Sequence, residues 1–194
     1  MNRFPWDEGF ALGFDFSSGL PEGTETVKRY FSDMKSMYQD RDAAEHLPGS
    51  SNPCIYEYCD LGCPERDGDL AFGTTVLYPG RIGNEYFMTK GHFHSKLMTA
   101  EVYFTLNGTG LMLIENREGN CREFDMSPGR AVYVPRGFAH RSVNTGSSPL
   151  VFFYSYPADA GHDYGSIETS GFRHIVLHTD EGPKVQCNPR WEGA

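Results

Sequence analysis

The sequence lacks the features that mark membrane-embedded or nucleic-acid-binding proteins. It contains no apolar run close to the roughly 20 residues that a membrane-spanning helix needs. Its 17 Lys and Arg residues form no obvious cluster, and 26 carboxylates give a formal net charge of −9. This balance argues against nucleic acid as the main partner. Internal repeats and low-complexity segments are also missing, so we expect a soluble protein that binds neither nucleic acid nor membrane.

The five cysteines include no Cys-x-x-Cys pair and are odd in number. No secretory signal is recognisable either, and together these features favour free thiols in a reducing cytoplasm. Cys54, Cys59 and Cys63 lie close together in the sequence, but no histidine accompanies them nearby. A second metal site at these cysteines is therefore disfavoured.

The length of 194 residues fits one domain, since domains commonly contain about 100 to 200 residues. The first two dozen residues are rich in Gly, Pro and aromatic side chains and predict an irregular arm. Apolar residues at helical spacing between Glu25 and Tyr38 predict a short amphipathic helix. From Ile55 onward, short segments rich in Val, Tyr, Phe and Thr alternate with Gly-containing turns, which predicts an antiparallel barrel or sandwich. We expect a single domain, 1–194, with the arm and helix in 1–50 and the barrel in 51–191.

Two histidines separated by one residue, His92 and His94, suggest a metal site. In an extended strand, alternate side chains share a face, so both imidazoles project to the same side. Glu101 begins the next apolar and polar alternation, in which Glu101, Tyr103 and Thr105 share one face. A hairpin would then bring Glu101 beside the two histidines.

A fourth candidate ligand, His140, comes from a distant part of the chain. Residues 131–134 predict a strand, Pro135 and Gly137 predict a turn, and the chain then returns through His140. A closed barrel could carry His140 to the same interior point as the other three side chains. We predict that one divalent metal ion is bound by four ligands: His92, His94, Glu101 and His140.

Three neutral imidazoles and one carboxylate would leave a divalent ion with a net charge near plus one. A six-coordinate ion would keep two positions for water or substrate. Iron, manganese, nickel and zinc all suit such ligands. We expect one ion per subunit, with iron named first and the other three metals as alternatives.

These stretches resemble the two motifs of the cupin superfamily. The spacing of Gly129, Pro135, Gly137, His140 and Asn144 matches the second motif in full. The first motif departs slightly, because six residues separate the second histidine from the glutamate where three or four are most common. That longer link narrows the resemblance to the cupin-type glucose-6-phosphate isomerases, from about Thr24 to Trp191. Four further segments carry it: Val76–Gly80, Thr89–His94, Ala100–Tyr103 and Tyr156–Gly165.

The resemblance implies an all-β cupin fold, a jelly-roll-like antiparallel barrel. We expect a homodimer, because the exposed strand edges of a small barrel and an apolar N-terminal arm tend to be covered by another chain. The resemblance also implies interconversion of glucose 6-phosphate and fructose 6-phosphate. In one route, a carboxylate moves the proton from C2 to C1 through a cis-enediol, and Glu101 is the best candidate base. In the other route, a metal polarises the carbonyl while hydride passes directly between the two carbons. The sequence does not distinguish these routes.

The resemblance assigns roles to further residues. Hydroxyls and a backbone N–H can hold a phosphate without a lysine, which would answer the repulsion expected from an acidic chain. Lys96 and Arg141 are additional possible counter-charges for the phosphate, but each is more often a solvated surface residue, and we interpret them in that way. His162 is expected to protonate the sugar ring oxygen. The implied phosphate and substrate residues are Tyr56, Thr75, Thr89, Gly91 and Tyr164, and the implied catalytic residues are Glu101, Tyr103, Tyr156 and His162.

Two other functions remain open. Three histidines and one glutamate also bind metal in cupin dioxygenases, whose open positions take substrate and oxygen. A sugar-phosphate-binding cupin without turnover would keep the pocket and could dispense with the metal. Oxygen consumption would indicate the first alternative, and binding without isomerisation would indicate the second.

Overall fold

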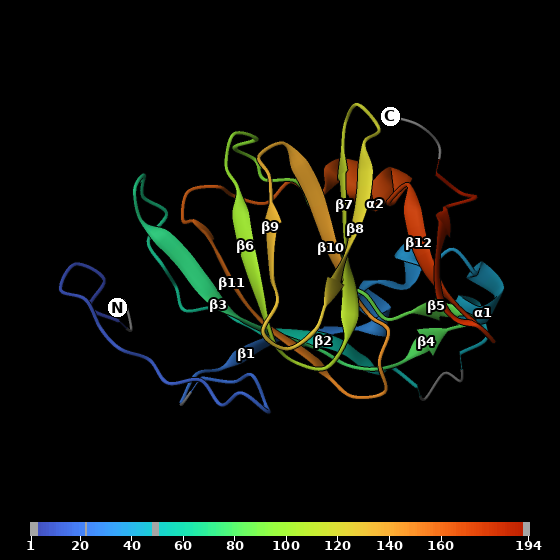
Figure 1. The fold of residues 1–194 in the computed structure, drawn as a ribbon, viewed down its shortest axis with the longest axis horizontal. Helices are drawn as coiled ribbons and strands as arrows, with labels where there is room; N and C mark the ends of the chain where they lie inside the picture. Colours follow the sequence, from blue (N-terminus) through green and yellow to red (C-terminus); the bar gives the residue numbers. More distant parts are fainter. Residues whose placement is uncertain (1–3, 22, 48–50, 192–194) are drawn as a thin grey trace.

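Antiparallel sheets make up most of the fold in the computed structural model, which describes residues 4–21, 23–47 and 51–191 (Figure 1). The largest sheet has six strands in the order β1 (Thr26–Tyr30), β2 (Cys54–Cys59), β3 (Leu70–Leu77), β11 (Leu150–Pro157), β6 (Glu101–Asn107), β9 (Ala131–Val134). A second sheet has the order β10 (Phe138–Asn144), β7 (Gly110–Asn116), β8 (Cys121–Met126). A third has the order β13 (Gly182–Cys187), β12 (His174–Thr179), β5 (Glu85–Tyr86), β4 (Arg81–Ile82). The predicted all-β cupin fold is confirmed.

Strand β6 shows how the sequence pattern becomes a two-faced strand. Glu101, Tyr103 and Thr105 are buried, whereas Val102 and Phe104 are exposed. Alternate residues of a strand point to opposite faces, so the carboxylate of Glu101 and the Tyr103 ring both face the interior. The predicted alternation in this strand is confirmed.

The helix predicted between Glu25 and Tyr38 is wrong. That segment forms strand β1, followed by two short 3-10 turns, η1 (Phe31–Asp33) and η2 (Lys35–Met37). β1 pairs with β2 from Thr26 opposite Cys59 to Arg29 opposite Tyr56, and this long-range pairing satisfies backbone groups that a helix would have bonded locally. Some of the apolar residues at helical spacing nevertheless belong to the buried core: Phe31, Met34 and Tyr38.

The helices that do form are short. Helix α1 (Arg41–Glu45) begins after Asp40, whose side chain accepts a hydrogen bond of 2.9 Å from the Ala43 backbone N–H. Helix α2 (Gly165–Ser170) follows the segment that includes Tyr164. No helix in the described ranges is long and apolar enough to cross a membrane.

The N-terminal arm packs on its own chain. The rings of Trp6 and Phe10 lie 6.0 and 6.1 Å from the ring of Phe72 on β3, and Phe14 lies 5.9 Å from Phe153 on β11. These aromatic contacts hold the arm against neighbouring strands of the large sheet. The arm therefore covers part of one sheet face, at one end of the view in Figure 1.

The interior lies between the large sheet and the β10-β7-β8 sheet. Met112 and Ile114 of β7 and Phe152 of β11 belong to one buried apolar cluster. Isolated bridges pair Met88 with Val143 and His92 with His140, which attaches the segment before β6 to β10. The barrel interior thus receives side chains from β6, from β10 and from this connecting segment.

Candidate metal centre and substrate site

Segments far apart in the sequence meet at His92 and His140. The His92 N–H donates to the His140 carbonyl at 3.3 Å, and the His140 N–H donates to the His92 carbonyl at 3.2 Å. One residue further along, Phe93 and Asp163 exchange backbone hydrogen bonds of 3.0 and 2.8 Å. The segment that carries the first two histidines is therefore held between β10 and the 156–165 segment.

Glu101 lies at the centre of this arrangement. Its carboxylate is 3 % exposed, and the Oε2 atom lies 3.1 Å from His94 Nε2 and 2.9 Å from His140 Nε2. The rings of His92 and His140 are 4.4 Å apart between centroids. One ligand atom from each of the four residues lies within 4.8 Å of the other three. The structure thus brings together the four residues that the sequence pattern selected.

The unpaired nitrogens at this point fit a cation. His92 Nε2 and both ring nitrogens of His140 are buried and make no hydrogen bond within the described part of the chain. The contact between His140 Nε2 and Glu101 is short, but its orientation is not that of a hydrogen bond. Buried nitrogen lone pairs without partners are costly, and a shared divalent ion would satisfy them together with the carboxylate. Three nitrogens and one oxygen are a donor set that several transition metals accept.

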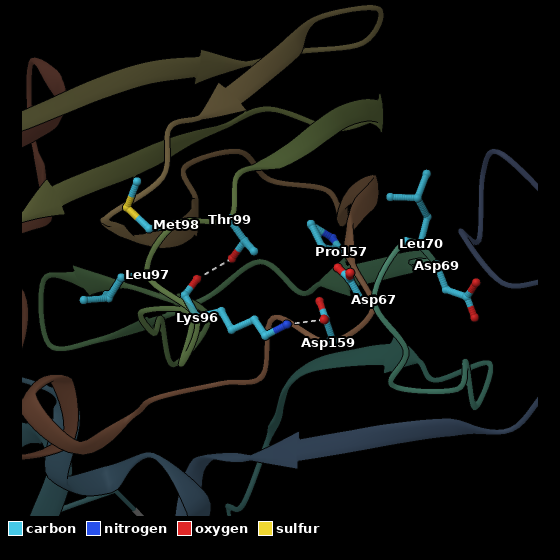
Figure 2. A pocket seen from close by; sticks show the side chains of 10 residues that line it. Asp67, Asp69, Leu70, Lys96, Leu97, Met98, Thr99, Pro157 and Asp159 are labelled. Atoms are coloured by element: carbon cyan, nitrogen blue, oxygen red, sulfur yellow. Dashed lines mark hydrogen bonds and ion pairs between the residues drawn. The ribbon is translucent and has the colours of Figure 1, made fainter.

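Thr99 orients one of the imidazoles and was not identified from the sequence. Its hydroxyl donates to the Lys96 carbonyl at 2.6 Å (Figure 2). Its oxygen also lies 2.8 Å from His94 Nδ1. Because the one hydroxyl proton is used on Lys96, Nδ1 of His94 must be the donor to Thr99. That tautomer leaves Nε2 with a lone pair directed to the ligand cluster.

The surroundings of His92 and Glu101 favour the protonation states in which histidine and glutamate bind a metal. Burial, followed by the charge of His140, lowers the pKa of His92 well below its ordinary value, so this imidazole is neutral. Burial would raise the pKa of Glu101, but the neighbouring histidines, His140 first, outweigh it and hold the pKa well below the usual range. A neutral imidazole and an ionised carboxylate are the forms that bind a metal.

Aromatic side chains surround the cluster. The ring of Tyr103 lies 5.6 Å from that of His140, and Tyr156 lies 5.7 Å from His94. His162 lies 4.4 Å from His92 and stacks nearly parallel to Tyr164 at 6.0 Å. The four predicted residues of this group therefore all lie at the histidine cluster, although they come from β6, β11 and the 156–165 segment.

The predicted phosphate residues occupy a second region. Tyr56 on β2 and Thr75 on β3 are buried, and burial, followed by the charge of the nearby Tyr164, raises the pKa of Tyr56. Thr89 bonds to β10, because its hydroxyl accepts from the Ser142 N–H at 3.0 Å. Gly91 lies one residue before His92, so it connects this region to the ligand cluster. Among the described residues, no hydrogen bond joins Thr75 to Thr89 or Gly91.

The two cations that we interpreted as surface residues behave differently. Lys96 is exposed and forms an ion pair with Asp159 beside a cavity of about 590 Å³, which none of the four clustered ligands lines (Figure 2). Arg141 is fully buried on β10, so its interpretation as a surface residue is wrong. Six of the seven β10 residues are buried, and alternation could not have indicated this because both faces of β10 are covered.

Comparisons with known proteins identify the family of the chain. The sequence model of the family described as glucose-6-phosphate isomerase (GPI) matches residues 28–191. Glucose-6-phosphate isomerase from Thermococcus litoralis is 47 % identical over 186 residues, covering 96 % of this chain and 98 % of the relative. The enzyme of the same name from Pyrococcus horikoshii is 47 % identical over 187 residues, covering 96 % and 99 %. Among solved structures, oxalate decarboxylase from Bacillus subtilis overlaps with a TM-score of 0.43 at 24 % identity, covering 55 % of this chain and 26 % of that one.

Proposed function

This chain belongs to the glucose-6-phosphate isomerase family, and we propose that it interconverts glucose 6-phosphate and fructose 6-phosphate as a metal-dependent enzyme. The observation that carries the proposal is the convergence of His92, His94, Glu101 and His140 at one interior point of a chain that the family match spans almost completely. Aromatic and hydroxyl side chains beside this point offer the contacts that a sugar phosphate needs.

One divalent ion per subunit would be held by the three imidazoles and the carboxylate of the cluster. Iron is our first choice, and manganese, nickel or zinc would also accept this donor set. When bound, the ion would supply positive charge that stabilises negative charge developing on the reacting sugar oxygens. The protein contributes the ligand geometry, and Thr99 contributes the orientation of His94.

Glu101 is the proposed base of the proton-transfer route. It is ionised and buried, and its carboxylate could take the C2 proton and return it to the neighbouring C1 carbon. A carboxylate with such a low pKa is a weak base, so we propose that it acts when its ligand bond loosens. In the alternative route, hydride passes directly between C1 and C2, and Glu101 serves as a ligand only.

The isotope content of the product distinguishes the two routes. Isomerisation in deuterium oxide would incorporate solvent deuterium at C1 or C2 if Glu101 carries the proton, because a carboxylic acid exchanges its proton with water. A direct hydride shift would leave the transferred hydrogen unexchanged. Nuclear magnetic resonance of the sugar carbons measures either result.

The residues around the cluster have proposed roles in binding. Tyr103 and Tyr156 would contact the reacting end of the sugar, and His162 would move a proton at the ring oxygen during ring opening. Tyr164 would close the site beside His162. The phosphate would be held by four further residues: Tyr56, Thr75, Thr89 and Gly91.

A homodimer is part of the proposal. Val102 and Phe104 of β6 and Tyr133 of β9 are 41 %, 40 % and 61 % exposed, and Val102 pairs with Tyr133 across the two strands. Adjacent exposed apolar side chains at the edge of a sheet are commonly covered by another chain. Sedimentation equilibrium measures the mass, and a monomer at micromolar concentration would contradict this part of the proposal.

Activity after metal removal tests the proposed function. Purified protein is treated with a chelator, and each divalent metal is then added back singly while a coupled assay follows conversion of fructose 6-phosphate to glucose 6-phosphate. We expect loss on chelation and recovery with at least one metal. Absence of activity in protein whose site is shown to be filled would refute the isomerase function. Oxygen consumption, or sugar-phosphate binding without turnover, would then indicate a dioxygenase or a binding protein.

A further inference from the structure

Arg141 is a buried cation that contacts the backbone next to Gly91, one of the predicted phosphate residues. It is 2 % exposed, and its guanidinium lies 4.4 Å from the ring centroid of Phe172. A guanidinium keeps its positive charge at neutral pH, and the carboxylates of Glu85 and Glu115 are near enough to interact with it. A buried charge needs partners of this kind, and a guanidinium has five donor hydrogens to distribute among them.

One of these hydrogens fixes the peptide unit between Lys90 and Gly91. Arg141 Nη2 donates to the Lys90 carbonyl oxygen at 2.7 Å. The structure contains no cis peptide bond in its described ranges, so the carbonyl oxygen and the following N–H point in opposite directions across the peptide plane. Because the Lys90 carbonyl points toward Arg141, the Gly91 N–H points away from it.

The Gly91 N–H is a hydrogen-bond donor without a protein acceptor. The neighbouring Thr89 and His92 N–H groups donate to carbonyls of β10, at 2.9 and 3.3 Å. No acceptor within the described part of the chain receives the Gly91 N–H. Gly91 is buried, and a buried backbone donor is normally paired, so this N–H is available to a ligand.

Arg141 and Phe172 also form the surface on which Gly91 lies. A Cβ atom added to Gly91 would lie 2.6 Å from Phe172 Cε2 and 3.1 Å from Arg141 Cβ. The φ angle of Gly91 is +72°, a region that residues with a side chain rarely adopt. The close packing and the backbone conformation therefore hold this peptide in one orientation.

We propose that Arg141 is a positioning residue for the substrate phosphate: it orients the Lys90–Gly91 peptide so that the Gly91 N–H donates to the phosphate, and it places a positive charge behind that donor. This inference rests on the proposed function. A guanidinium that bonds the carbonyl of a peptide polarises that unit and makes its N–H a stronger donor. A buried cation also attracts an anion locally in a chain whose net charge is −9.

Substitutions at Arg141 test the inference in metal-loaded enzyme. Arg141→Gln removes the charge, and Arg141→Lys keeps it with a shorter reach. The matched control is Arg173→Gln, since Arg173 also stacks on an aromatic ring, that of Trp191 at 3.9 Å, but donates to the Arg117 carbonyl instead. The readouts are KM and kcat for fructose 6-phosphate, the inhibition constant of inorganic phosphate, and the bound metal.

We expect Arg141→Gln to raise KM and the phosphate inhibition constant by about 10- to 100-fold, the scale of one charge-assisted hydrogen bond, with kcat changed by less than about threefold. Arg141→Lys should recover part of this loss, and Arg173→Gln should leave both constants within about twofold of wild type. Unchanged constants in Arg141→Gln would overturn the inference. A fall in kcat or metal content with KM unchanged would also overturn it.

A measurement on the unmodified chain covers the case in which Arg141→Gln does not fold. In zinc-loaded protein labelled with ¹⁵N, titration with inorganic phosphate should shift the Gly91 amide signal as the N–H gains an acceptor. Phosphate binding that leaves the Gly91 signal in place would refute the assignment. This titration does not depend on turnover, so it separates failure of the inference from failure of the proposed isomerase function.

Discussion

Replacing Glu85 with glutamine should change how the stability of the protein depends on pH. Glu85 lies on β5 with 1 % of its surface exposed, and its Oε2 accepts a hydrogen bond of 2.8 Å from the Gln39 N–H. Its Oε1 atom has no hydrogen-bond partner among the described residues. Burial raises the pKa of Glu85 from 4.5 to about 7, although the Gln39 N–H and the charge of Arg141 oppose the rise.

The sign of the effect follows from the protons bound in each state. Between about pH 4.5 and pH 7, the folded protein keeps a proton on Glu85 that the unfolded chain has lost. The folded state then binds more protons, so its stability falls as the pH rises through this window. A pKa difference of that size corresponds to about 3 kcal/mol of unfolding free energy, lost by wild type between pH 4 and pH 8. Glutamine resembles the protonated acid at every pH and avoids this loss.

Urea unfolding at pH 4 to 8 measures the effect in wild type and Glu85→Gln with the same metal loading. We expect the variant to gain about 3 kcal/mol relative to wild type across this range, with most of the change between pH 5 and 7. Both proteins carry the same metal ligands, so the titration of those ligands cancels in the comparison. The control is Glu118→Gln, which removes a carboxylate from the exposed turn after β7. A pH-independent difference would show that favourable contacts such as that with Arg141 offset desolvation, and a variant that becomes relatively less stable toward pH 8 would show that they outweigh it; either result would refute the reasoning.

Three further substitutions test the site. Thr99→Val should weaken metal binding about 10- to 100-fold in a chelator competition, because His94 loses the acceptor that fixes its tautomer. Thr99→Ser keeps the hydroxyl and should bind the metal as wild type does. Equal metal affinities in Thr99→Val and wild type would contradict this role. Thr89→Val should raise KM for fructose 6-phosphate about tenfold with metal content unchanged, and loss of metal instead would overturn the assignment of Thr89 to the phosphate region. Gly91→Ala should lower the unfolding free energy by about 2 kcal/mol or more, because the new Cβ would collide with Phe172 and because alanine disfavours the positive φ angle of this position. A melting temperature equal to that of wild type would refute the packing argument.

The ligand cluster was predictable because its signals are short-range. The alternation that begins at Glu101 depends on strand geometry, in which every second side chain shares a face. The hairpin predicted between the His92–His94 segment and β6 is wrong, because this segment forms isolated bridges to His140 and Asp163 instead. The position of His140 required a turn and a returning strand after residues 131–134 and a closed barrel. The strands found at β9, β10 and β6 are those that these patterns predicted. Local periodicity therefore indicated both the strands and the four side chains that meet between them.

The segment from Glu25 to Tyr38 shows where local pattern was insufficient. Its apolar spacing fits a helix, but residues Thr26–Tyr30 pair along their length with β2, almost thirty residues away. Propensity over a few residues is a weak preference, and pairing at an available sheet edge can override it. No local feature of the sequence reveals that this edge is open.

The sequence by itself determined the family, the all-β fold and the residue types that meet at the cluster, because these follow from motif spacing and strand periodicity. Only the tertiary structure decided that Thr99 orients His94, that Arg141 is buried behind Gly91, and that Glu85 lies without solvent beside Arg141. Each of these depends on which distant segments pack together, and burial and charge pairing are properties of that packing. A lone arginine or threonine looks the same in the sequence whether water or a buried carbonyl receives its hydrogen bond.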